Sequence, residues 1–461
     1  MKILNIIVFL LFLLLYSHLD IAGYAQTQTS CSDLEVVFED TSGFADTRPA
    51  VIVTDSSGDA HLFWLYKQNR EELSTWTINY SRWHDNYWSF PIDVLITPGG
   101  GAGAPHVALS SDGYLHIIWA GGGVWYSKSH VSVATDARAW TKPVIISSGL
   151  DADITIDDSN NLHVAAATGE SRGPVYYLQS SDGDNWSIPT TIFSDLSSNA
   201  TSMHPRISVD GRGRIHVTWT EYQIPEGWPP LGQWYIRSED NGEIWDNAIK
   251  IGVGEQGQGT VATIGDDQIH LVWRGSSIAG NSYHQWSQDG GKNWSGHTIF
   301  DPDGGFSGVH TMAADSSGNL HLVRGDGGYQ VWQNRSWSPV PALFADSGET
   351  GTLAIGLGNQ VHWVNTTPSS SKSAEVRHRL CLSDSPPIDP KPVTQITPTP
   401  LQLTAPVSDT PTPTNIPNSI SSNVENPSLS SGSITPLLIG FITPLCLIVI
   451  IILLRKYLNR G

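Results

Sequence analysis

Apolar and polar residues alternate along most of the chain, in short runs that come in pairs. One such pair, RPAVIVTDSSGDAHLFW, covers residues 48–64 and is interrupted by a turn of Asp, Ser and Gly. Alternation with a period of two predicts β-strands, and these turn residues tolerate positive φ, so each pair predicts a β-hairpin. Six more copies follow at 104–119, 152–167, 204–219, 259–273, 309–324 and 351–364.

A second pair of strands, rich in aromatic residues, follows each of the first six hairpins. Clear examples are 175–193, 233–251 and 283–300. Four short strands in about 50 residues is the size of one blade of a β-propeller. We therefore expect residues 31–382 to form an all-β, seven-bladed propeller, with six blades as the alternative.

The seventh repeat lacks a fourth strand, since only one strand (373–382) follows its hairpin. An unused strand at 33–40 would supply the missing one and close the ring. This closure places Cys31 and Cys381 on adjacent strands of one blade. We expect the two cysteines to form a disulfide that ties the ends of the ring together.

One histidine occupies the same position in all seven hairpins. A functional site requires its arrangement of residues at one place in the molecule. A residue repeated in every blade is therefore expected to be architectural. We expect these imidazoles to lie between repeats and to bond to backbone groups, not to a metal. No metal or cofactor site is predicted, and the DPDG turn (301–304) is a weak calcium candidate. The seven are His61, His116, His163, His216, His270, His321 and His362.

The two ends of the chain do not fit a propeller. Residues 1–25 resemble a secretory signal peptide, with one lysine, a short apolar run and small residues near Ala25. Residues 434–454 are uncharged and long enough to span a bilayer, and the basic tail 455–461 favours a cytoplasmic end. The Pro-, Thr- and Ser-rich residues 383–433 predict an extended stalk. We expect a propeller outside the cell, held by a single-pass anchor.

The charge of the chain limits its partners. It carries 44 acidic and 25 Lys or Arg residues, a net charge of −19. Basic residues cluster only in the predicted cytoplasmic tail. Nucleic acid is therefore not an expected partner.

Two turns share the pattern S-x-D-x-G-x-x-W at the same phase of the repeat. A version one residue shorter covers 180–186, and a degraded relative covers 80–88. The pattern resembles the Asp-box (bacterial neuraminidase repeat) of sialidase-like β-propellers. The resemblance implies a structural turn between the third and fourth strands of a blade, away from the active site. The matching residues are Ser238, Asp240, Gly242 and Trp245, and Ser287, Asp289, Gly291 and Trp294.

A ligand site is expected where loops enter the first strands and leave the second strands. The longest of these loops, 220–233, carries Glu226 and Trp228, which we expect to form a binding lip.

The resemblance to sialidases also implies an arginine triad, a Tyr–Glu pair and an aspartic acid as general acid. Tyr222 is adjacent to Glu221 and would point to the opposite face of a continuous strand, so Tyr329 is an alternative tyrosine. The candidates are Arg48, Arg274 and Arg324 for the triad, Glu221 and Tyr222 for the pair, and Asp46 for the acid.

Two functions follow from these patterns. The favoured one is a non-catalytic, surface-tethered propeller that binds a glycan or a protein partner through its loops. The alternative is a membrane-anchored exo-glycosidase of the sialidase type. The incomplete catalytic set favours the first.

Overall fold

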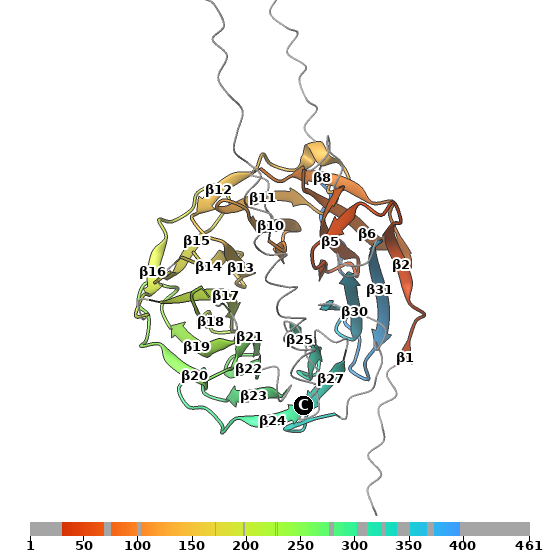
Figure 1. Cartoon of the computed structure of the whole chain (residues 1–461). Helices are drawn as coiled ribbons and strands as arrows, with labels where there is room; N and C mark the ends of the chain where they lie inside the picture. The colour runs from red at the N-terminus through yellow and green to blue at the C-terminus, as the bar shows by residue number, and fades with distance from the viewer. Residues whose placement is uncertain are drawn as a thin grey trace, which may run out of the picture. The chain divides into compact units, whose positions relative to one another are not determined.

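In a computed structural model, the chain folds into seven antiparallel β-sheets arranged in a ring (Figure 1). The structure describes residues 30–68, 75–98, 103–170, 172–196, 199–225, 227, 229–275, 281–301, 311–324, 328–338, 351–366 and 373–396. The seven-bladed propeller predicted from the hairpin repeats is confirmed, and the six-bladed alternative is wrong.

Each blade contains four main strands, which we call the first to the fourth strand from the centre of the ring outwards. The first blade has β3 (Ala45–Thr47), β4 (Val51–Thr54), β5 (Ala60–Gln68), β6 (Thr77–His84), β7 (Tyr87–Trp88) and β8 (Ile92–Ile96). The second has β9 (His106–Leu109), β10 (Tyr114–Ala120), β11 (Val124–His130) and β12 (Val144–Ser147), with a short 3₁₀ helix, η1 (Ala137–Ala139), before β12. The third has β13 (Asp151–Ile156), β14 (Leu162–Ala167), β15 (Val175–Ser180) and β16 (Thr190–Phe193).

The remaining blades repeat this order. The fourth has β17 (Ala200–Val209), β18 (Ile215–Gln223), β19 (Pro230–Ser238) and β20 (Ile249–Val253). The fifth has β21 (Gly257–Ile264), β22 (Gln268–Arg274), β23 (Ser282–Ser287) and β24 (Thr298–Asp301). The sixth has β25 (Thr311–Ala314), β26 (Leu320–Val323), β27 (Tyr329–Gln333) and β28 (Ser336–Trp337).

The seventh blade is built from both ends of the ring, as the strand count predicts. Its β29 (Gly351–Gly356), β30 (Gln360–Thr366) and β31 (Ala374–Leu382) are completed by β1 (Ser30–Cys31) and β2 (Glu35–Asp40), which both pair with β31. Cys31 lies opposite Cys381 in this pairing and forms a disulfide with it. The seam of the ring therefore lies inside one sheet and carries a covalent bond.

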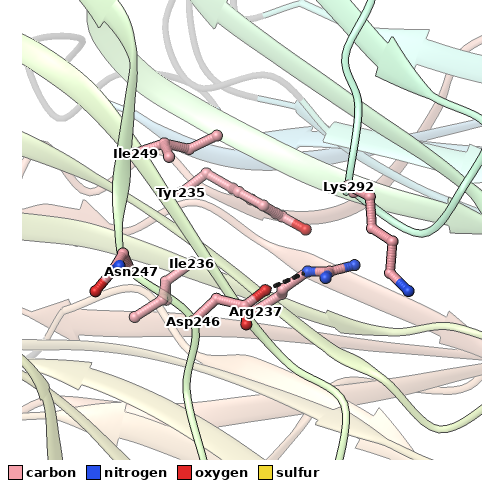
Figure 2. A pocket seen from close by; sticks show the side chains of 8 residues that line it. Tyr235, Ile236, Arg237, Asp246, Asn247, Ile249 and Lys292 are labelled. Carbon is pink, nitrogen blue, oxygen red and sulfur yellow. Dashed lines mark hydrogen bonds and ion pairs between the residues drawn. The ribbon is translucent and has the colours of Figure 1, made fainter.

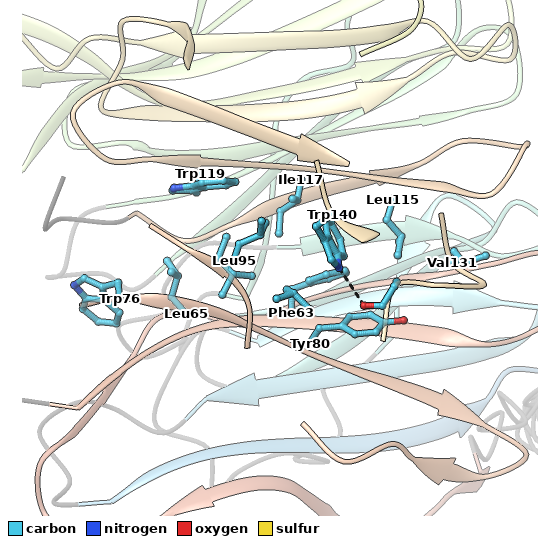
Figure 3. Packing of buried hydrophobic residues seen from close by; sticks show 13 residues of the cluster. Phe63, Leu65, Trp76, Tyr80, Leu95, Leu115, Ile117, Trp119, Val131 and Trp140 are labelled. Carbon is cyan, nitrogen blue, oxygen red and sulfur yellow. Dashed lines mark hydrogen bonds between the residues drawn. The ribbon is translucent and has the colours of Figure 1, made fainter. Parts of the chain in front are cut away.

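Apolar side chains fill the interfaces between blades. Between the first two blades, Phe63 and Leu65 of β5 pack with Ile117 and Trp119 of β10 (Figure 3). Alternate residues of a strand point to opposite faces of its sheet, so a blade covered on both faces needs apolar residues at nearly every position of its second strand. This explains why β5 and β10 are buried almost throughout.

The repeated histidines bond to side chains of their own blades, which corrects the expectation of backbone partners. In five blades the Nδ1 atom lies within hydrogen-bonding distance of a tyrosine hydroxyl of the third strand, for example 2.7 Å between His216 and Tyr235. In the other two blades a second histidine takes the place of the tyrosine, His284 beside His270 and His378 beside His362.

Three of these histidines also contact a turn aspartate through Nε2, at 2.9 to 3.2 Å: His61 with Asp55, His216 with Asp210 and His321 with Asp315. A neutral imidazole can donate from one nitrogen and accept at the other, so it satisfies the aspartate and the tyrosine together. Burial lowers the pKa of His216, which favours this neutral form. The histidines thus fix the first turn of a blade to its third strand.

The S-x-D-x-G-x-x-W turns hold themselves together by side chain to backbone bonds. In the fifth blade, Ser287 Oγ accepts the Gly291 amide at 2.9 Å, and Asp289 Oδ1 accepts the Asn293 amide at 2.9 Å. Trp294 packs edge-on against Tyr235 of the preceding blade, and Trp245 does the same against Tyr177. The tryptophan of each turn therefore joins two blades.

The propeller continues past Leu382, where composition places the start of the stalk. Residues 383–396, which we call the strap, run along the turns that join the first and second strands of several blades. The expected signal peptide, the rest of the stalk and the anchor at 434–454 lie outside the described residues. No helix in the described ranges is long and apolar enough to cross a bilayer.

Candidate functional site

The two faces of the ring differ in their construction. The turn face carries the turns between first and second strands and between third and fourth strands. The loop face carries the segments that leave the second strands and enter the first strands. The repeated histidine contacts and the S-x-D-x-G-x-x-W turns belong to the turn face, so variation between blades is concentrated on the loop face.

Buried polar residues occupy the loop-face ends of the second strands in four consecutive blades. They are Tyr222, Arg274, Arg324 and Asn365, from the fourth to the seventh blade. In the first three blades, β10 and β14 end at Ala120 and Ala167, with the buried Thr168 directly after β14, and β5 continues to the partly buried Gln68. We call the first four residues the polar group of the loop face.

Two members of the polar group replace a repeated tryptophan. Four blades carry a buried tryptophan three residues after the repeated histidine: Trp64, Trp119, Trp219 and Trp273. Arg324 and Asn365 stand at this position in the sixth and seventh blades. A buried polar group in place of a core tryptophan usually lowers stability, and proteins keep such groups mainly at functional sites. These two positions are therefore candidate functional ones.

Strand alternation directs both buried arginines into the interface between the fifth and sixth blades. Arg274 lies four residues after His270, whose ring contacts Trp332 of the sixth blade at 6.0 Å. Arg324 follows Leu320 by four residues, and Leu320 pairs with the same Trp332, which contacts His284 of the fifth blade. Burial lowers the pKa of Arg274. One interface therefore receives two buried cations near its loop-face end.

Tyr222 is 5 % exposed, and its hydroxyl has no hydrogen-bond partner among the residues that the structure describes. Burial raises the pKa of Tyr222 to about 12, against the opposing effects of the neighbouring Gln258 side chain and of the Arg274 charge. Buried tyrosine hydroxyls usually have a partner, because an unpaired one costs roughly 1–3 kcal/mol. The hydroxyl is suited to accept or donate one hydrogen bond to a ligand.

Glu221 belongs to a different environment from its neighbour. Its carboxylate accepts hydrogen bonds from the Trp234 indole at 3.0 Å and from Lys250 at 2.8 Å. Tyr222 instead packs edge-on against the His204 ring. The two side chains point away from each other, as expected for adjacent residues of a strand. The carboxylate of Glu221 is thus committed to Trp234 and Lys250.

The inner strands are irregular beside Tyr222. His204 in β17 and Gln258 in β21 have φ of 52° and 53°, and each lies where the register to the second strand shifts. Left-handed backbone is uncommon for residues other than glycine and bulges often occur next to binding sites. Asp151 of β13 holds His204, accepting its amide at 3.0 Å and contacting Nδ1 at 2.9 Å.

The first-blade candidates differ from the buried arginines in their exposure and in their contacts. Arg48 is exposed and its guanidinium lies over the Trp76 ring at 5.1 Å, as does the Lys67 ammonium at 5.2 Å. Asp46 lies opposite Lys67 in the β3–β5 pairing. One Asp46 carboxylate oxygen is buried without a hydrogen bond in the described part of the chain.

The remaining candidates are Tyr329, Glu226 and Trp228. The Tyr329 hydroxyl contacts His321 at 2.5 Å, so this tyrosine is the architectural partner of a repeated histidine and not a spare nucleophile. Glu226 and Trp228, the expected binding lip, lie outside the described residues.

A pocket of about 230 Å³ lies on the turn face, between the fourth and fifth blades (Figure 2). Tyr235, Arg237, Asp246 and Lys292 are among its lining residues, and Arg237 Nε donates to Asp246 at 2.6 Å. Tyr235 and Arg237 already bind the framework there, through His216 and the Gly290 carbonyl. The pocket belongs to the blade-to-blade contact and is separate from the polar group.

Sequence reasoning found three of the four residues of the polar group and missed Asn365. The available signal was its position: Asn365 aligns with the repeated tryptophans. His204 and Asp151 were also missed, because backbone conformation and inter-strand contacts have no local sequence signature.

Comparison with known proteins gives only distant similarities. No family model matches the chain. No curated protein matches it either. Solved structures do: a protein of unknown function from Dyadobacter fermentans is 11 % identical with a TM-score of 0.49, over 77 % of this chain and 99 % of that one. The NanB sialidase of Streptococcus pneumoniae is 12 % identical with a TM-score of 0.44, over 77 % and 71 %. A polysaccharide lyase, an ulvan lyase, is 12 % identical with a TM-score of 0.47, over 72 % and 94 %.

Proposed function

We propose that the protein is a cell-surface propeller that binds a glycan through the polar group of its loop face. The observation that carries this proposal is the run of buried polar residues, two of them arginines, at the second-strand ends of four consecutive blades. The S-x-D-x-G-x-x-W turns add support, because they resemble those of carbohydrate-active propellers. A glycan presents many hydroxyl groups, which match the amide of Asn365 and the hydroxyl of Tyr222.

The two arginines favour a glycan that carries an acidic group. A guanidinium binds a carboxylate or a sulfate through two parallel hydrogen bonds. The net charge of −19 repels anions over most of the surface. Arg274 and Arg324 offset this repulsion at one interface, which would confine an anionic ligand to that place.

Binding is preferred to hydrolysis because Glu221 and Tyr222 do not form the pair that hydrolysis would need, in the part of the loop face that the structure describes. Glycosidases of the ordinary kind place two carboxyl groups on either side of the bond that they cleave, or a tyrosine paired with a carboxylate. Glu221 is held by Trp234 and Lys250, and Tyr222 points away from it. In the exo-sialidase alternative, a carboxylate other than that of Glu221 would have to pair with Tyr222.

Binding of the full-length protein, kept in detergent micelles, to immobilised neutral and acidic oligosaccharides tests the proposal. Arg274→Ala and Arg324→Ala should each weaken binding of acidic glycans about 10- to 100-fold, the usual effect of losing a charged hydrogen bond. Arg48→Ala is the matched control, since Arg48 is exposed and lies over Trp76. Equal losses in all three variants, or none in the first two, would reject the polar group as the site. Binding to a surface protein but to no glycan would favour a protein partner.

The enzyme alternative has its own test. Wild-type protein is mixed with a fluorogenic sialoside, and release of the fluorophore is followed. Hydrolysis that Arg274→Ala and Tyr222→Phe both abolish would establish a sialidase. Our proposal expects no release above the buffer rate.

We also propose that the chain is secreted through residues 1–25 and anchored through 434–454. Alkaline extraction of membranes from expressing cells should leave the full-length protein in the pellet. Protease added to intact cells should remove the propeller. Release by alkali would contradict the anchor, and protection from protease would contradict the external location.

A further inference from the structure

The strap, residues 383–396, crosses the turns of four blades on both sides of the seam. Composition assigns it to a Pro-rich stalk, yet backbone or side-chain bonds join it to the sixth, seventh, first and second blades. The seam lies in the seventh blade, where the N-terminal strand β2 meets β31. The strap thus connects the last two blades of the ring to the first two.

The sixth blade receives the strap at the aspartate of its first turn. Ser385 is buried, and its hydroxyl donates to Asp315 Oδ2 at 2.5 Å. The same oxygen contacts His321 Nε2 at 2.9 Å, so the strap shares a carboxylate with the repeated histidine of that blade. Ser316 Oγ donates to the Pro386 carbonyl at 2.6 Å.

The seventh and first blades hold the middle of the strap by its backbone. The Ser383 and Ile388 amides donate to the Asn359 and Leu357 carbonyls at 2.9 and 2.7 Å. Ser56 of the first blade exchanges two bonds with Lys391: its carbonyl accepts the Lys391 amide at 2.6 Å and its hydroxyl donates to the Lys391 carbonyl. These bonds use opposite sides of the seam within nine residues of strap.

The second blade receives the end of the strap in its core. Val393 packs against the cluster that fills the interface of the first two blades. It lies close above Gly113, where an added β-carbon would be 2.8 Å from the valine methyl. The Ile396 amide reaches Ser132 Oγ at 3.4 Å.

We propose that the strap is a seam lock: it holds the first and last blades together on the turn face and thereby shields the disulfide of the seventh blade. None of the strap contacts described above involves Cys31 or Cys381. Cys381 is 1 % exposed and Cys31 is partly buried, so a reductant's access to the bond is restricted and increases when the seam opens. A lock that spans the seam lowers the frequency of this opening without touching the sulfur atoms.

The rate of disulfide reduction under native conditions tests the seam lock. Full-length protein is treated with dithiothreitol, and alkylation of Cys31 and Cys381 is followed by peptide mass spectrometry, with Cys446 scored separately. Ser385→Ala should speed reduction about fivefold, the effect of one ordinary hydrogen bond. Val393→Asp, which places a charge in an apolar cluster, should speed it further.

The matched control is Asn161→Ala in the third blade. Asn161 Nδ2 donates to Asp157 Oδ2 at 2.8 Å, in a turn of the same design that the strap does not touch. This variant should lose comparable thermal stability and leave the reduction rate within twofold of wild type. If both strap variants reduce at the wild-type rate, or if Asn161→Ala reduces as fast as they do, the strap is not a seam lock.

Discussion

Trp294 of the fifth blade lies edge-on against Tyr235 of the fourth, with ring centroids 4.9 Å apart and planes at 79°. The same tyrosine hydroxyl contacts His216 Nδ1 at 2.7 Å within its own blade. Gly291, in the turn that carries Trp294, lies directly above the tyrosine, and an added β-carbon would be 2.2 Å from its hydroxyl oxygen. The turn is therefore shaped by the neighbouring blade as much as by its own residues.

Replacing Gly291 by alanine should destabilise the protein by about 2 kcal/mol or more, because φ is +83° and the methyl group would collide with Tyr235. Thermal or urea unfolding measures the change. Gly296→Ala is the control: its β-carbon meets nothing within 4 Å, so the unfolding midpoint should stay at the wild-type value. Equal midpoints for the two variants would contradict the close contact.

Removing one tyrosine hydroxyl should weaken a blade through the histidine that it leaves unpaired. Tyr126→Phe deletes the partner of His116 Nδ1 at 2.7 Å. The expected loss is about 1–3 kcal/mol in the free energy of unfolding, as for other buried groups left without a partner. Tyr114→Phe, on the same blade, serves as the comparison, because the Tyr114 hydroxyl is not the partner of His116 Nδ1. A smaller loss for Tyr126→Phe than for Tyr114→Phe would refute the role of the pair.

The buried histidines should make stability fall in mild acid. Burial lowers the pKa of His116 and of His270 to about 4, from an ordinary value of 6.5. The unfolded chain therefore takes up protons between pH 6.5 and 4 while the folded chain does not, so the stability is full above pH 6.5 and is lost as the pH falls towards 4. Urea unfolding at a series of pH values should show this decline, and His116→Gln should make it shallower. A flat profile over this range would contradict the buried neutral state.

Removing the disulfide should cost more stability than any single substitution above. Cys31 and Cys381 close a loop with a sequence separation of 350. The chain-entropy argument gives about 6 kcal/mol for so long a loop. Unfolding of Cys31→Ser with Cys381→Ser, against wild type, checks this value. A difference below about 1 kcal/mol would contradict this loop-closure argument.

Asn365→Leu should separate stability from binding. Asn365 is 1 % exposed, and neither polar atom of its side chain has a hydrogen-bond partner in the ranges that the structure describes. An apolar residue of similar size removes this cost, so the unfolding temperature should rise or stay equal. Glycan binding should fall if the amide serves a ligand. Loss of stability together with unchanged binding would identify Asn365 as a structural residue.

Much of the fold could be predicted from the sequence because each blade repeats its own local signals. Alternating strands and Asp/Gly turns define the hairpins, and counting strands reveals that 33–40 must close the last blade. The partners of the repeated histidines could not be predicted, since they depend on cross-strand register, such as His216 opposite Arg237 with Tyr235 two residues away. The strap was also unforeseen, because its Pro-rich composition is that of a linker.

The site was predictable only where chemistry and strand position coincide. Arg274 and Arg324 are the only arginines directly at second-strand ends among the described residues, and their charge made them visible. Asn365 carries no charge, and its significance appears only when it is aligned with the tryptophans of other blades. The conformation of His204 arises from a bulge in β17, which depends on pairing with β18.

The contacts by which the S-x-D-x-G-x-x-W turns fix one blade against the next, through Trp245, Trp294 and Gly291, lie on the turn face. This separation makes the ring modular: one rim specifies assembly, while the opposite rim is open to change. Exchange of the segments on the loop rim between blades, or their replacement by segments of other length, should leave assembly intact. The ring is accordingly a scaffold on which new recognition could be engineered, or could arise by drift, without redesign of the blades.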